Sequence, residues 1–408
     1  MRQSNLIVYI TASLIFLRTL PYVIWPAMIA FPATRFIIDF LIVICFVLHR
    51  DLKSYYRVLM VVLFLSILIF LWVSKTTIIT VLVLLLFIFI PFSKDKFCCR
   101  VYDIFLKTYV IVIGLSLVAW VFSFIYEFPN FGTVVAYNDE NRTYVNYGIF
   151  LKQLLSLDLG LEAFRFSGVY DEPGWVGTIN TVLLCINKFN LKKLDNFILF
   201  LSGLFSFSLY FYVFLIFYGI YYIFKSKNMY VLLTICSIVL FLYLYTKENE
   251  FIYQSVWNRF EWNSKEGRFE GDSRTVGVGG STDVETFYEK IKWTNQYWWG
   301  VDNKEAYSEL AKGTCTYKTI VALYGMAFFS LYCAFFVLLG LYSHKKRKDL
   351  LLYLFIFLSL MYQRPFVFDP LWFFLLTIFI KRDLLAINDN PTLESKAAMV
   401  QTKKALYC

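Results

Sequence analysis

The chain has 408 residues, of which 59% are hydrophobic, 21% are aromatic and only 17% are charged. Its mean hydropathy of +0.61 lies well outside the usual range of a soluble domain and predicts a membrane protein. The net charge of +10 does not indicate a nucleic-acid partner, because the Lys and Arg residues lie in short clusters between apolar runs. We therefore expect an all-α fold, that of a polytopic integral membrane protein.

Apolar runs follow one another through most of the chain. A helix needs roughly 20 mostly apolar residues to cross a bilayer core. The first run has a basic start, but no small-residue cleavage site follows it, so we expect a retained helix and not a signal peptide. The expected helical runs are 6–25, 34–48, 56–73, 77–92, 104–126, 174–187, 196–224, 230–245, 319–342, 350–362 and 366–380.

Basic clusters in the turns decide the topology, since all of them should face the cytoplasm. The run 196–224 breaks this pattern, because as one long tilted helix it would place one of its two flanking clusters outside. A chain reversal at SGLFSFS, 202–208, would remove the conflict by forming two short helices or a re-entrant hairpin. With the reversal we expect about twelve helical segments and both termini in the cytoplasm. The clusters are HRDLK at 49–53, KDKFCCR at 94–100, KFNLKK at 188–193, KSK at 225–227, HKKRK at 344–348 and KR at 381–382.

Two segments, 127–173 and 246–318, are too polar to cross a membrane and are expected to be large loops on the outer face. The second includes 284–297, which has the spacing of a short amphipathic helix. We expect one membrane domain over residues 1–380 and a disordered cytoplasmic tail over 381–408. Four of the eight cysteines lie inside apolar runs, so no disulfide framework is expected.

Carboxylates and arginines are the groups available for chemistry on the outer face. The two histidines, His49 and His344, lie in clusters assigned to the cytoplasm. This excludes nucleophiles with a histidine base and His-based zinc sites from the outer face. No outer segment has an Asp-x-Asp pair, so we expect no metal and no cofactor. Arginine binds phosphate oxygens in a bidentate manner, and the outer arginines are Arg142, Arg165, Arg259, Arg268, Arg274 and Arg364.

The stretch RFSGVYDEPGWVG, 165–177, joins the first outer loop to an apolar run. Pro173 disfavours helix at Glu172 and suits the first turn of the helix that follows. Asp171 and Glu172 would then lie at a helix N-terminus, where backbone N–H groups and the dipole favour anions. Two interpretations remain open: these carboxylates cap and solvate the helix end, or one of them serves as a catalytic base.

The second outer loop contains WNRFEWN (257–263), GDSRT (271–275) and YWWGVDN (297–303). Tryptophan rings pack well against sugars, but tryptophan also gathers at membrane interfaces. Both interpretations apply to Trp298 and Trp299.

Charged residues also interrupt the first two apolar runs. Arg18 lies in the first run, while Arg35 and Asp39 share a face in the second, four residues apart. Such charges either line a functional cavity or lie near helix ends and extend their charged groups to the surface.

Taken together, the motifs resemble the Wzy-type O-antigen polymerases, within the wider group of polysaccharide polymerases and O-antigen ligases. The resemblance covers residues 160–380; before that, only hydrophobicity agrees. The chain departs from the family pattern at Leu209, where members often have arginine, and at Gly174, where they often have asparagine. The resemblance rests on RFSGVYDEPGWVG before a helix, the short-helix pair around LFSFS, RFEWN and GDSRT in a large outer loop, and WWGVDN followed by TYKTIVALYGMAFF.

The resemblance implies a metal-independent glycosyltransferase of lipopolysaccharide biosynthesis at the outer face of the bacterial inner membrane. Such enzymes transfer the growing glycan from undecaprenyl pyrophosphate to the non-reducing end of a lipid-linked repeat unit. The expected partners are that oligosaccharide, membrane lipids and a chain-length regulator protein. The expected site consists of Glu172 or Asp171 as the base, Arg165, Arg259 and Arg274 on the pyrophosphate, and Trp298, Trp299 and Arg364 on the glycan.

Two alternatives to a polymerase remain. An O-antigen ligase would have the same architecture, but ligases use an outer histidine, which this chain lacks under the expected topology. A transporter such as a lipid-linked oligosaccharide flippase would need arginines only to steer an anionic substrate, and it would not need two large polar loops on one face.

Overall fold

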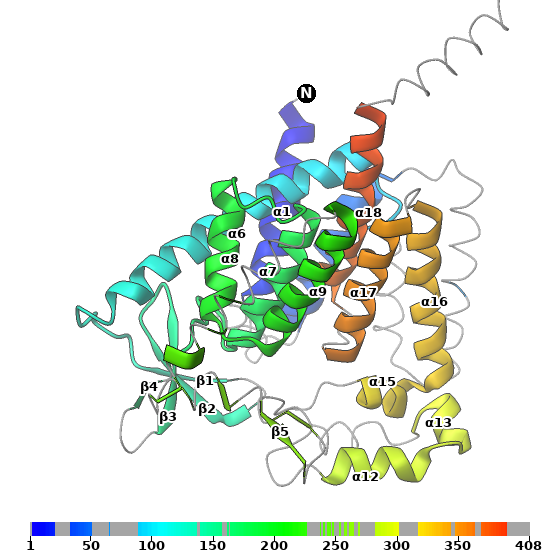
Figure 1. Ribbon diagram of the computed structural model, residues 1–408. Helices are drawn as coiled ribbons and strands as arrows, with labels where there is room; N and C mark the ends of the chain where they lie inside the picture. The colour runs from blue at the N-terminus through cyan, green and yellow to red at the C-terminus, as the bar shows by residue number, and fades with distance from the viewer. Residues whose placement is uncertain are drawn as a thin grey trace, which may run out of the picture.

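The helices of the chain form a bundle with polar loops at one end (Figure 1). Most of the described residues are helical, as expected for an all-α fold. The expected run 56–73 lies almost entirely outside the described residues, as do most of 77–92 and most of 230–245. The computed structural model describes residues 2–20, 33–50, 65, 89–136, 139–156, 161–162, 164–226, 237, 240, 243–245, 247–248, 253, 257–258, 261–264, 268–269, 282–301, 317–343, 347–363 and 369–389.

A central helix explains how the bundle is packed. In α18 (Pro370–Asp389) every residue from 370 to 381 is buried, as is typical of a helix that is apolar on all sides and surrounded by others. The other bundle helices are α1 (Arg2–Thr19), α3 (Ala33–Leu48), α6 (Asp95–Phe122), α7 (Pro173–Ile186), α8 (Leu194–Phe205), α9 (Leu209–Ser226), α16 (Met326–Ser343) and α17 (Arg347–Gln363).

One helix in the described part of the chain, α6, is long and apolar enough to cross a membrane. Its most apolar window has a mean hydropathy of 2.1, and 50% of that window is buried. Of the shorter apolar helices, α1 and α8 pack against it. Because a buried helix of a soluble core passes the same test, the membrane assignment rests on the composition of the whole chain.

The run 196–224 is divided into two helices. Helix α8 ends at Phe205, α9 begins at Leu209, and Phe207 between them has a φ of 45°. Phe189, which follows α7, stacks on Tyr218 of α9 with ring centroids 4.0 Å apart. Since α9 thus returns toward the residues that precede α8, the two helices form a hairpin, and the single tilted helix is excluded.

Several basic clusters meet at one end of the bundle. Lys94 N donates to His49 O at 2.8 Å, which joins the clusters at 49–53 and 94–100. Lys381 Nζ lies 2.6 Å from Asp95 Oδ1, and Arg382 lies 3.4 Å from Asp103. Helix α1 begins and α18 ends at this same end (Figure 1).

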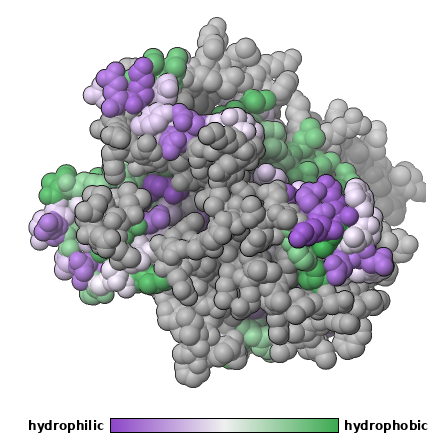
Figure 2. Space-filling view, turned by 90° about the horizontal axis from the view of Figure 1, so that it is seen from below, coloured by the Kyte–Doolittle hydropathy of each residue, from purple (hydrophilic) through white to green (hydrophobic). Residues whose placement is uncertain are grey.

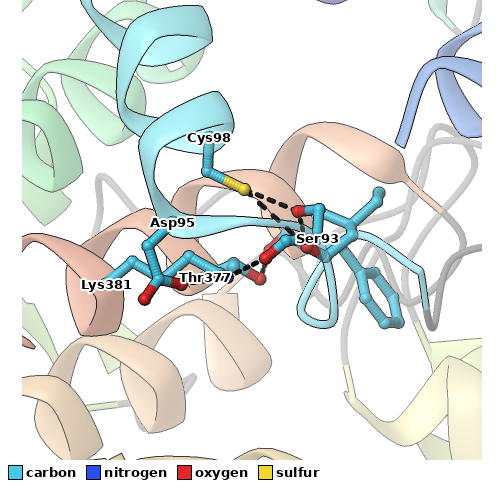
Figure 3. A network of polar contacts seen from close by, with 7 residues as sticks. Ser93, Asp95, Cys98, Thr377 and Lys381 are labelled. Atoms are coloured by element: carbon cyan, nitrogen blue, oxygen red, sulfur yellow. Dashed lines mark hydrogen bonds and ion pairs between the residues drawn. The ribbon is translucent and has the colours of Figure 1, made fainter. Parts of the chain in front are cut away.

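Lys381 is the centre of a polar network that links α18 to the start of α6 (Figure 3). Its ammonium donates to the carbonyl oxygen of Ser93 as well as to Asp95, and the hydroxyl of Ser93 lies 2.6 Å from the thiol of Cys98. Helix α18 continues beyond the apolar run and ends at Asp389. The first part of the tail expected to be disordered is therefore helical, and 390–408 lies outside the described residues.

The opposite end carries the polar elements (Figure 1). A four-stranded antiparallel sheet in chain order lies within 127–173, the first segment expected to be an outer loop. This sheet was not predicted. Figure 2 views this end and shows hydrophilic and hydrophobic residues side by side on its described part. The strands are β1 (Thr133–Ala136), β2 (Asp139–Asn146), β3 (Leu151–Ser156) and β4 (Leu161–Glu162), with a second pair, β5 (Trp262–Asn263) and β6 (Arg268–Phe269).

The described part of 246–318, the second segment expected to be an outer loop, includes short helices at the same end. The amphipathic helix expected at 284–297 is present as α12 (Thr282–Ile291) and α13 (Asn295–Trp299), separated at Trp293, whose φ is 68°. The run expected at 319–342 is likewise divided at Gly325, φ 89°, between α15 (Tyr317–Tyr324) and α16. A Cβ at Gly325 would overlap the carbonyl oxygen of Trp298, so glycine permits this close approach.

Candidate functional site

The segment 164–172 crosses between the sheet and the helical bundle. Phe166 N donates to Phe205 O at 2.8 Å, at the end of α8. On the other side, Leu151 N of β3 donates to Gly168 O at 2.7 Å, and Ser167 Oγ donates to Leu151 O at 2.7 Å. The backbone of this segment is therefore fixed by both neighbours just before the two carboxylates.

Arg165 joins the first motif to the hairpin turn. Its Nε donates a 3.3 Å hydrogen bond to the carbonyl oxygen of Ser206, and the residue is half-buried. The RFSGVYDEPGWVG and LFSFS motifs, which are separate in the sequence, therefore meet in space.

Glu172 occupies the N-cap position of α7, and Pro173 begins the helix as predicted. The backbone at Glu172 is extended, with φ −146° and ψ 120°, and its side chain makes no capping hydrogen bond. A capping hydrogen bond therefore does not account for the position of this carboxylate. Asp171 and Glu172 are both half-buried.

The hairpin turn packs directly on the first turns of α7. A Cβ at Gly177 would overlap Cβ of Ser208 and lie 2.7 Å from its Oγ. Deeper in the bundle, Tyr109 Oη donates to Asn180 Oδ1 at 2.8 Å and Asn180 Nδ2 donates to Ser202 Oγ at 2.8 Å. These contacts fix α7 against α6 and α8, and with them the position of the carboxylates at its N-terminus.

A buried ion cluster lies at the end of α1. Arg18 Nε donates to Asp39 Oδ1 of α3 at 2.9 Å, and Arg18 Nη2 lies 3.4 Å from Asp369 Oδ2. The three side chains are 8%, 5% and 9% exposed. Asp369 Oδ1 also accepts a 2.9 Å hydrogen bond from Leu371 N at the start of α18. Asp39 was predicted only to share a helix face with Arg35, whose side chain is outside those described, and the structure pairs Asp39 with Arg18 of another helix.

Asp369 was missed by the sequence analysis. Two signals could have found it: an Asp-Pro pair directly before an apolar run, which is typical of a helix N-cap, and an arginine in the first run that needs a counter-ion if it is buried. Neither signal alone identifies Asp369 and Arg18 as partners.

The next residue of α1 contacts the carboxylate motif. Thr19 Oγ1 lies 3.0 Å from Tyr170 Oη and donates its own proton to Phe16 O at 2.7 Å. Tyr170 is therefore the donor in the pair, since a hydroxyl has one proton. Burial raises the pKa of Tyr170, although the bond to Thr19 acts in the opposite direction, so the phenol stays protonated at neutral pH.

The remaining predicted site residues lie elsewhere. Arg259, Arg274 and Arg364 are outside the described residues. Trp298 and Trp299 are on α13, where they are 43% and 51% exposed. Helix α13 packs against α12, α15 and α16, so these rings belong to the polar end of the molecule but to a different element from the carboxylates.

Comparison of the chain with protein-family models, curated proteins and solved structures gave no match in any of the three. The geometry itself offers an arginine and two carboxylates at one end of an apolar bundle, beside a helix N-terminus. Such a set can bind an anionic leaving group and accept a proton.

Proposed function

We propose that the protein is a Wzy-type polysaccharide polymerase, an integral-membrane glycosyltransferase that uses a polyprenyl-pyrophosphate-linked glycan as donor. The observation that carries the proposal is the hydrogen bond of Arg165 to the hairpin turn at Ser206. This turn packs on Gly177 of α7, the helix that follows the Asp171-Glu172 pair. Two of the motifs on which the resemblance rests are thus in contact, which supports the proposal.

The chemistry follows from these groups. The bond between the anomeric carbon of the donor glycan and the pyrophosphate oxygen breaks, and a bond forms between that carbon and a hydroxyl oxygen of the acceptor sugar. Glu172, or Asp171 in the second place, takes the proton of this hydroxyl. Arg165, Arg259 and Arg274 offset the charge that develops on the departing pyrophosphate, for which the planar guanidinium is well suited.

The orientation in the membrane is part of the proposal. The end with the clusters at 49–53, 94–100 and 381–382 faces the cytoplasm under the positive-inside rule. The site lies at the opposite end and would face the periplasm or exterior of a bacterial inner membrane, where lipid-linked repeat units are presented. A chain-length regulator protein is a partner consistent with this location.

The test is glycan length in cells that lack the protein, compared with cells in which the wild-type chain or Arg274→Ala is restored. Single repeat units on lipid A without the protein, and a ladder of long chains only with the wild type, are the expected results. Complete absence of attached glycan in the deletion strain would contradict polymerisation and favour a ligase or a flippase.

A further inference from the structure

A hydroxyl and an arginine that are adjacent in α1 contact two different parts of the molecule. The guanidinium of Arg18 reaches Asp39 and Asp369, while the hydroxyl of Thr19 reaches Tyr170, the residue directly before the two carboxylates. The end of α1 therefore lies between the buried ion cluster and the candidate site.

Arg18 itself is not suited to bind the pyrophosphate. Among the ion pairs of the described side chains, two carboxylates face one guanidinium. These three groups have a net charge of −1 if all are ionised, which would repel an added anion. Its Nη2 makes an ion pair with Asp369 but no hydrogen bond. The cluster instead fixes geometry, because a buried arginine that left either carboxylate would leave charges uncompensated.

Tyr170 transmits this geometry to the carboxylates. Its backbone closes a turn with Ser167 O at 3.0 Å, and its hydroxyl donates to Thr19. Only Asp171 and Glu172 separate it from Pro173, which begins α7 and has a restricted φ. The two carboxylate residues are thus held between a fixed tyrosine and a fixed helix start.

We propose that Arg18 and Thr19 are positioning residues for the candidate base: the buried Arg18–Asp39–Asp369 cluster fixes the end of α1, and the Thr19–Tyr170 hydrogen bond fixes Asp171 and Glu172 relative to it. This inference rests on the proposed function and assigns a role to a part of the chain on which the family resemblance does not rest.

The experiment measures chain extension by the full-length protein, purified in detergent or nanodiscs, with the undecaprenyl-pyrophosphate-linked repeat unit as substrate. Thr19→Val keeps the size of the side chain and removes the acceptor, while Tyr170→Phe removes the donor. Each is expected to lower kcat about five- to tenfold, the effect of one hydrogen bond, with KM unchanged. The double variant should be no worse than either single variant, because both remove the same bond.

Matched controls separate positioning from folding. Thr11→Val removes a buried hydroxyl on the same helix that donates to Ile7 O of its own backbone. Tyr353→Phe removes a buried tyrosine hydroxyl that donates to Phe336 O. Both should retain wild-type kcat per folded molecule, with folded protein measured by gel filtration and thermal unfolding.

Arg18→Lys tests the ion cluster. Lysine keeps the charge but cannot reach two carboxylates with a planar fork, so kcat should fall, and the combination with Thr19→Val should fall less than the product of the two effects. If the fall in kcat of the double variant equals the product of the two single falls, the two residues act independently, and the link from Arg18 to Thr19 is wrong.

The outcomes distinguish this inference from the proposed function. If the wild type extends chains and Thr19→Val and Tyr170→Phe match it, the positioning role is wrong and the polymerase stands. If Thr19→Val and Tyr170→Phe give less folded protein but an unchanged kcat per folded molecule, the two residues have only a structural role and the inference is also wrong. If the wild type itself extends no chain, the proposed function is wrong and this inference is wrong with it.

Discussion

Arg165 donates a hydrogen bond of 3.3 Å from its Nε to the carbonyl oxygen of Ser206, in the turn between α8 and α9. This bond uses the Nε–H of the guanidinium. It orients the side chain toward the hairpin, and a guanidinium oriented by its Nε can present its terminal nitrogens as a pair to phosphate oxygens.

Arg165→Lys should therefore impair polymerisation although the charge is kept. A lysine cannot both hold the Ser206 oxygen and bind an anion in a bidentate manner. We expect a fall of about tenfold or more in chain extension, measured as the length distribution of glycans on a gel. Arg100→Lys, at an exposed position near the other end of the bundle, is the control and should behave as wild type. Full activity of Arg165→Lys would contradict a role on the pyrophosphate.

Glu172→Gln should abolish long chains. The substitution keeps the shape of the side chain and removes the base, and general base catalysis contributes about 10²- to 10⁴-fold. Asp171→Asn should have the smaller effect, because adjacent residues diverge and only one can face the acceptor. Both variants are compared at equal expression. Near-normal polymer from Glu172→Gln would exclude it as the base, and the reverse order of the two effects would assign the role to Asp171.

The sequence could predict those features that depend on local rules. Pro173 at the first helical position follows from its fixed φ and missing N–H, and the structure has it there. The division of 196–224 was predicted from charge alone, since two basic clusters on one side require a reversal between them, and the structure places the turn at Ser206–Ser208.

Features that depend on distant partners could not be predicted in this way. Strand β2, DENRTYVN, has little apolar alternation and becomes a strand because β1 and β3 pair with it, and the pairing register is a tertiary property. Asp369 and Arg18 are far apart in the chain, and only the packing of α18 against α1 shows that they meet.

Gly177→Ala should destabilise the hairpin against α7. The added Cβ would overlap Ser208, and such overpacking typically costs about 1–3 kcal/mol. The measurement is thermal unfolding of the purified protein in detergent. Gly114→Ala on α6 is the matched control, because its Cβ would meet Ile198 at an ordinary 3.5 Å, and it should unfold at or above the wild-type temperature. Equal unfolding temperatures for the two variants would show that the turn does not pack on α7 as described.

Asp95→Asn should lower the stability of the protein more than the same substitution at Asp103. The side chain of Lys381 is 6% exposed and pairs with Asp95, so in this variant the buried ammonium loses its counter-ion. Breaking a fully buried pair costs about 3–5 kcal/mol of stability. The loss here should be smaller, because Asp95 is 38% exposed. Adding Lys381→Met should restore much of the loss. The control is Asp103→Asn, whose pair with Arg382 is 33% and 53% exposed and should contribute little. Unfolding temperatures that are the same for Asp95→Asn and Asp103→Asn would contradict the special role of the buried pair.

The proposed orientation in the membrane can be tested by labelling single cysteines from outside. Leu191, between α7 and α8, and Ser226, at the end of α9, flank the hairpin, and the return of α9 toward Phe189 puts them on one side of the bundle. Trp298 lies at the opposite end, on α13.

In a background without native cysteines, a membrane-impermeant maleimide added to intact spheroplasts should label position 298 only. Positions 191 and 226 should both be labelled only after the membrane is permeabilised. Labelling of 226 but not 191 from outside would contradict the hairpin within the membrane. Labelling of both from outside would reverse the orientation and place Glu172 in the cytoplasm. This result would contradict the proposed function, which requires chain extension on the outer face.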